Sequence, residues 1–108
     1  IITAIGSDAP VTHPNPMNSF FAALNLKDIK TRDNVGSGQK VTVKELVRMF
    51  TYNGAYVSFE EDIKGSLEPG KLADIVILDQ DLLTYDPENI TDVKVKYTLI
   101  DGQIVYQA

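Results

Sequence analysis

The side chains of this 108-residue chain that could take part in chemistry are few. They are the carboxylates of Asp8 and Asp74 and the imidazole of His13, which is the single histidine. A hydrolytic zinc site needs about three protein ligands, and the sequence contains no cysteine. The residues of this chain therefore do not predict a complete metal site, and each candidate must be weighed against a structural role.

Asp8 follows an apolar, β-branched run over residues 1–5 that is ended by Gly6. This run predicts a buried strand followed by a loop over residues 7–14. At such a position aspartate often only makes local hydrogen bonds in a turn, and from the residues alone this interpretation leads the catalytic one by roughly two to one. His13 lies in the same loop and is expected to be exposed.

Asp74 lies in the apolar run over residues 72–78, which predicts a buried strand. A structural role is expected here, because a buried carboxylate must accept hydrogen bonds from its surroundings. The glycines at positions 36 and 38 do not form a phosphate-binding loop, since no Gly-Lys-Ser/Thr follows them.

Charge and composition exclude several classes of function. The net charge is −5, and the ten basic residues are dispersed, so we expect neither a nucleic-acid partner nor an anionic membrane partner. No apolar run approaches the ~20 residues needed to span a bilayer, and no secretory signal is visible. The lack of cysteine leaves the redox compartment open, with the cytoplasm favoured. An apolar start without methionine is what a piece of a longer protein would show.

Two amphipathic helices are predicted in the first half of the chain. Asn15 and Pro16 read as N-cap and first helical residue, and apolar residues follow at helical spacing. After a polar loop over residues 27–40, Thr42 and Glu45 form a capping box. The second helix is expected to run to about Tyr52, to break or bend at residues 53–54, and to continue for a turn or two.

The second half is expected to be mostly β. Pro69 and Gly70 have the residue types of a type II turn. A strand with one wet face is predicted over residues 93–99, and Asp101 and Gly102 form a type I′ hairpin turn before a returning strand at residues 104–106. The predicted fold class is therefore α+β.

These segments carry a resemblance to a known family. Residues 65–79 (GSLEPGKLADIVILD) resemble the stretch with which amidohydrolases leave their catalytic barrel and enter a small β-sandwich, and residues 101–106 resemble the closing hairpin of that sandwich. Residues 42–61 are similar to one branch, the amidohydrolase family 3 group. Residues 6–11 (GSDAPV) resemble its last barrel strand and the loop after it, so the likeness covers essentially the whole chain.

The resemblance implies a particular division of the chain. Residues 1–62 would be the end of a (β/α) barrel, comprising its last strand, the metal loop and helices. Residues 63–108 would be part of a composite β-sandwich that ends in a hairpin.

The resemblance also implies a function. In this superfamily the active site lies at the C-terminal ends of the barrel strands. The match places on Asp8 both a metal contact and the transfer of a proton from the attacking water to the leaving group. The other ligands are mostly histidines on earlier strands, and His13 matches none of them. The intact enzyme would use a divalent metal, zinc being favoured, to hydrolyse an amide or related C–N bond of a small molecule. The isolated chain is expected to bind no metal and to be inactive.

A second hypothesis is a freestanding, non-enzymatic α+β module that uses its β half for assembly or binding. The absence of metal ligands favours this hypothesis, and the resemblance of residues 65–79 to the exit from an amidohydrolase barrel disfavours it. In the family, the sandwich also includes strands from before the barrel. The fragment is therefore expected to expose strand edges and apolar helical stripes, and to self-associate as a dimer.

Overall fold

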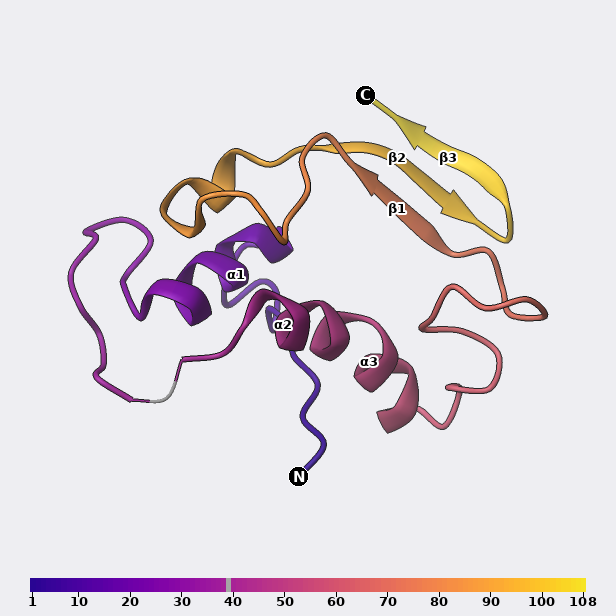
Figure 1. Cartoon of the computed structure of the whole chain (residues 1–108), viewed down its shortest axis with the longest axis horizontal. Coiled ribbons are helices and arrows are strands. Elements are labelled where there is room, and N and C mark those ends of the chain that lie inside the picture. The colour runs from indigo at the N-terminus through magenta and orange to yellow at the C-terminus, as the bar shows by residue number, and fades with distance from the viewer. Residues whose placement is uncertain (39) are drawn as a thin grey trace.

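The computed structural model describes residues 1–38 and 40–108, in which three α-helices precede a three-stranded sheet (Figure 1). This order confirms the predicted α+β class. The elements are α1 (Pro16–Asn25), α2 (Val43–Phe50), α3 (Tyr52–Val57), β1 (Ile75–Leu78), the 3₁₀ helix η1 (Pro87–Asp92), β2 (Val95–Ile100) and β3 (Gln103–Gln107).

Helix α1 begins as its sequence predicts. The Asn15 side chain accepts a hydrogen bond from the Met17 amide at 3.0 Å, and Pro16 occupies the first turn, where its missing N–H costs nothing. The apolar residues at helical spacing all face the core, which confirms the predicted stripe: Met17, Phe20, Phe21 and Leu24.

Helix α2 begins with the predicted capping box. The Thr42 hydroxyl oxygen accepts from the Glu45 amide at 3.2 Å, and the Glu45 carboxylate accepts from the Thr42 amide at 2.7 Å. Hydrogen bonds from the Thr42 amide, and then from its hydroxyl, lower the pKa of Glu45. The stability that the ionised Glu45 carboxylate contributes is therefore present above the ordinary glutamate pKa. It is lost as the pH falls through the lowered pKa.

The predicted break at residues 53–54 is wrong. Helix α2 ends at Phe50, and the interruption falls on Thr51 (φ −117°, ψ −92°), so that Asn53 and Gly54 lie inside α3. Asn53 is buried, and its side-chain amide donates to the Thr3 carbonyl at 2.7 Å. This long-range contact holds in a helix two residues that locally favour a turn.

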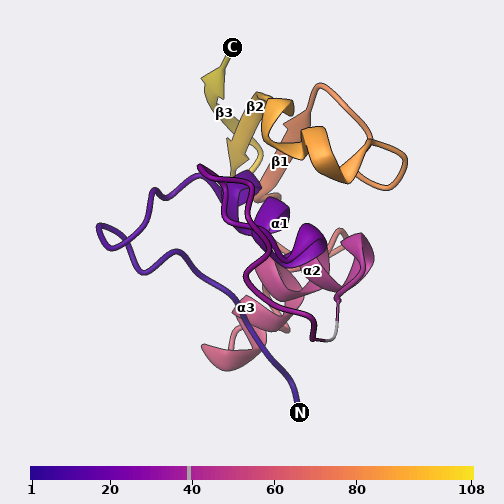
Figure 2. The same ribbon diagram turned by 90° about the vertical axis from the view of Figure 1, so that its left-hand side faces the viewer.

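The predicted strand over residues 1–5 is also wrong for this chain. Residues 1–7 form no strand, and this segment leaves the helices on the side opposite the sheet (Figure 2). A strand needs backbone partners on a neighbouring strand, and the sheet that the described residues form contains only β1, β2 and β3.

The turns of the β half are confirmed. Gly70 has φ +93°, and the Lys71 amide donates to the Glu68 carbonyl at 3.2 Å, as expected for a type II turn. Asp101 and Gly102 both have positive φ, as a type I′ hairpin requires. The sheet is antiparallel throughout, in the order β1-β2-β3.

The prediction of a buried strand over residues 72–78 is wrong in both length and burial. Strand β1 starts only at Ile75, and Val76 and Ile77 are 56% and 45% exposed. Within the described residues the sheet meets the helical core at Leu78 of β1, and most of the sheet extends beyond the helical part (Figure 1). An apolar strand is buried only when a second layer covers it, and that layer is not formed by residues 1–38 and 40–108.

The hydrophobic core lies between α1, α2 and the segment around η1. It therefore joins side chains from both sides of residue 62, and the proposed division at that point stays a prediction. Its buried members are Met17, Phe20, Phe21, Leu24, Leu46, Ile90 and Val93.

Gly65 is the glycine with the tightest surroundings. It has φ +93°, and an added Cβ would lie 2.7 Å from the Ala55 Cβ and 3.1 Å from the Tyr52 Cα. We expect Gly65→Ala to lower the free energy of unfolding by about 2–4 kcal/mol, through backbone strain and the clash with α3. Gly70→Ala is the matched control: it has the same φ and open space, so it should cost only about 1 kcal/mol. Urea denaturation of both variants measures the difference, and equal losses would contradict the close approach.

Candidate functional site

Asp8 lies in a tight turn that follows the unpaired N-terminal segment. Its φ is +52°, and its carbonyl accepts a hydrogen bond from the Val11 amide at 2.9 Å. The Thr12 hydroxyl closes the same loop by donating to the Ser7 carbonyl at 2.6 Å. The Asp8 side chain itself is exposed, so in this chain the carboxylate stands in solvent at the tip of an ordered turn.

His13 is exposed, which confirms its expected position on the loop surface. Its Nδ1 atom accepts a hydrogen bond from the Asn15 amide at 3.1 Å, so the imidazole supports the start of α1. The structure does not bring His13 together with Asp8 and Asp74 in one group.

The residues present do not fit a complete metal site. In the part of the chain that the structure describes, no three His, Cys, Asp or Glu side chains lie close enough together to hold an ion. Three protein ligands are the usual minimum for catalytic zinc, and Asp8 offers at most one.

Over residues 1–38 and 40–108, no helix is long and apolar enough to cross a bilayer.

The segment between α3 and β1 is organised around Lys71. Its ammonium group donates to the Glu61 carbonyl at 2.6 Å and to the Ser66 hydroxyl at 2.7 Å, and it lies 2.9 Å from the Glu68 carboxylate. The side chain is only 14% exposed, so Lys71 ties three points of one loop together. Sequence reasoning missed this role, because the partners of Lys71 come together only in the folded loop.

Glu68 completes this arrangement. Its carboxylate accepts a short hydrogen bond from the Ser66 hydroxyl and pairs with Lys71. The Ser66 hydrogen bond, followed by the Lys71 interaction, holds the pKa of Glu68 below its usual value. The loop thus keeps its charge pair at neutral pH and loses it only in acid.

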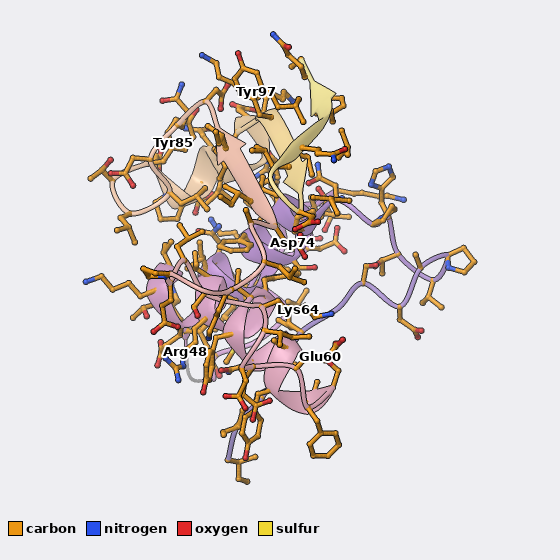
Figure 3. All side chains as sticks on the ribbon, turned by 90° about the vertical axis from the view of Figure 1, so that its right-hand side faces the viewer. Arg48, Glu60, Lys64, Asp74, Tyr85 and Tyr97 are labelled. Atoms are coloured by element: carbon orange, nitrogen blue, oxygen red, sulfur yellow. The ribbon has the colours of Figure 1, made fainter. Side chains whose placement is uncertain are left out.

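Asp74 accepts a backbone hydrogen bond as the sequence predicts, but the expectation that its carboxylate is buried is wrong, because the residue is exposed. Its carboxylate accepts a hydrogen bond from the Asp101 amide at 2.9 Å, which fixes the β2–β3 turn to the start of β1. Figure 3 shows Asp74 at the end of the sheet that faces α3. Asp79 does the same at the other end of β1, where it accepts from the Lys94 amide at 2.9 Å. The two aspartates therefore bracket β1 and hold its register against β2.

Comparison with known proteins defines the class to which these features belong. The family model of amidohydrolase family 3, described as the amidohydrolase family, matches residues 1–106. The Bacillus subtilis protein YtcJ, whose name describes an amidohydrolase, is 28% identical over 99% of this chain and 21% of its own length. An N-substituted formamide deformylase of Arthrobacter pascens is 27% identical, over 96% of this chain and 19% of its own length.

A solved structure agrees with the sequence comparison. An amidohydrolase from Thermotoga maritima superposes with a TM-score of 0.68 at 25% identity, covering 100% of this chain and 24% of that one. The chain belongs to the amidohydrolase family. It spans about a fifth of the length of the curated relatives that it matches.

Proposed function

We propose that this chain is the C-terminal part of a metal-dependent hydrolase that acts on amide or related C–N bonds of small molecules. Residues 1–62 are the end of its (β/α) catalytic barrel, and residues 63–108 are part of its composite β-sandwich. The observation that carries the proposal is the family match over residues 1–106. The name of the formamide deformylase among the relatives supports cleavage of a C–N bond.

We assign Asp8 to the active site of the intact enzyme. The turn that holds it leaves its carboxylate exposed, so it is accessible to a substrate or to ligands from elsewhere in the polypeptide. The remaining ligands of a divalent metal, with zinc favoured, would come from outside residues 1–108. When bound, the metal would activate a water molecule, and the contribution of this chain would be a carboxylate that can accept a proton. A cytoplasmic location is part of the same proposal.

Hydrolysis by the intact natural protein tests this function. The purified protein and the 108-residue chain should be compared on a panel of N-formyl and N-acetyl amines, and their bound metal should be measured by mass spectrometry. We expect the intact protein to contain a divalent metal and to release amine, and the 108-residue chain to do neither. Hydrolysis by the isolated chain would overturn the assignment of the site to the longer protein.

Self-association of the isolated chain follows from its uncovered sheet. Val76, Ile104 and Val105 are each more than half exposed, and the outer edges of β1 and β3 have no strand partner within the described residues. Uncovered edges and apolar faces favour pairing with a second copy. Sedimentation velocity from micromolar to millimolar concentration should show a dimer, and a monomer at every concentration would contradict the prediction. A well-defined dimer of a natural product of this size would instead favour the alternative of a freestanding assembly module.

A further inference from the structure

Phe59 occupies a backbone position that normally requires glycine. Helix α3 ends at Val57, the Phe59 amide donates to the Tyr56 carbonyl at 3.0 Å, and the Glu60 amide donates to the Ala55 carbonyl at 2.9 Å. These two bonds define a Schellman motif, in which the residue after the cap is left-handed. Phe59 accordingly has φ +60°, a conformation that is strained for a bulky side chain.

The conformation is imposed by its surroundings. The Ser58 hydroxyl donates to the Glu60 carboxylate at 2.8 Å, and Lys64 pairs with the same carboxylate at 2.6 Å. These two partners, Lys64 first, lower the pKa of Glu60. Figure 3 shows Glu60 and Lys64 close together beside α3. Residues on both sides of Phe59 therefore hold the backbone of the turn in place.

Among the described residues, the ring of Phe59 gains little packing that could offset this strain. Phe59 is 92% exposed, so its phenyl group faces solvent at the end of α3. Nearby along the chain, Val57, Ile63 and Leu67 are also at least half exposed. Two residues on, one carboxylate oxygen of Glu61 is buried and has no hydrogen-bond partner among the described residues. Both apolar and polar groups of this segment are thus left without the partners that a finished interface supplies.

We infer that Phe59 is an anchor that inserts into the part of the intact polypeptide outside residues 1–108. This inference rests on the proposed function. The related Thermotoga maritima structure supplies the occupant, because about three quarters of that chain lies outside the region matched here. A strained aromatic residue is retained where the strain fixes a side chain for binding, and a fully buried aromatic ring is a typical interface anchor. Phe59 is the proposed contact point for this partner, and Val57, Ile63 and Leu67 are other exposed apolar side chains of the same segment.

The test is whether Phe59→Gly changes the melting temperature in opposite directions in the isolated chain and in the intact protein. In the isolated chain, Phe59→Gly removes the left-handed strain and no buried contact, so the melting temperature should rise by about 4–8 °C. In the intact protein, the same change removes the buried ring, and the first thermal transition should fall by several degrees. Asp101→Gly is the matched control, since Asp101 is an exposed residue with φ +49° and should shift both proteins in the same direction.

Four results would overturn the anchor. Phe59→Gly could raise the melting temperature of both proteins while the intact protein still hydrolyses amides, which leaves the proposed function standing. The substitution could fail to raise the melting temperature of the isolated chain, which removes the strain. It could instead abolish a dimer of the isolated chain, which makes a second copy the occupant. If the natural product has only 108 residues, the proposed function fails together with the anchor.

Discussion

Replacing Asp8 by asparagine in the intact enzyme is expected to lower kcat by about 10²- to 10⁴-fold, the usual contribution of a positioned general base. Asparagine retains the size of the side chain and its tolerance of positive φ, which matters because Asp8 has φ +52°. The loop should therefore keep its turn while losing its proton acceptor. Steady-state kinetics on the best substrate of the panel measures the effect.

The control for this substitution is Asp33→Asn. Asp33 is also an exposed loop aspartate, and the same change there should leave kcat within about twofold of the wild type. The melting temperature should be unchanged in both variants, so that unfolding is excluded as the cause. An Asp8→Asn enzyme with wild-type kcat would remove Asp8 from the active site and leave it as a turn residue.

Replacing Phe21 by alanine is expected to lower the free energy of unfolding by about 3–5 kcal/mol, as for other buried phenylalanines. Phe21 is fully buried in the core between α1, α2 and η1. Its ring also lies 4.2 Å below the Arg32 guanidinium, a cation–π contact that the substitution removes. Because domains of this size have only about 5–15 kcal/mol of stability, the variant should lose a large share of it and unfold at a clearly lower urea concentration.

Phe59→Ala provides a matched control, because it deletes the same atoms from a side chain that is 92% exposed. We expect a change within about 0.5 kcal/mol there, as is usual for surface substitutions. Urea denaturation followed by far-ultraviolet circular dichroism measures both variants. Equal losses at the two positions would show that the core around Phe21 does not carry the stability of the chain.

The local features of the fold could be predicted because their causes are local. The Asn15 cap, the Thr42–Glu45 capping box and the Asp101–Gly102 turn each depend on residues within four positions of one another. Caps and tight turns close hydrogen bonds between near neighbours, so the sequence contains what determines them.

The predictions that were wrong concern segments whose structure depends on partners far away in the sequence. Residues 1–5 have the composition of a buried strand, yet they find no strand to pair with in the described part of the chain. Strand β1 is apolar, yet among the described residues no helix covers Val76 and Ile77, which stay exposed. The apolar pattern of a segment indicates what the segment can pack against. It does not indicate whether that partner is present. The interruption falls on Thr51 and not on residues 53–54, and the contact that Asn53 makes inside α3 is with Thr3, fifty residues away in sequence.

The candidate site could be predicted only by resemblance. From residue types alone, Asp8 looks like a turn aspartate, and the structure confirms a turn without showing catalytic neighbours. The hydrogen bond of Asp74 to the Asp101 amide agrees with its predicted structural role, although the residue is exposed and not buried as expected. The role of Lys71 was not, because its three partners converge only when the loop folds.

The most direct measurement is the intact mass of the natural gene product, taken by mass spectrometry from its source cells. A mass several times the 11.9 kDa of this chain is the predicted result, because a (β/α) barrel adds about 250 residues. Such a mass would make this chain the C-terminal part of an amidohydrolase, with Asp8 as its contribution to the active site. A natural product of about 11.9 kDa would contradict the account and leave a freestanding assembly module as the better description.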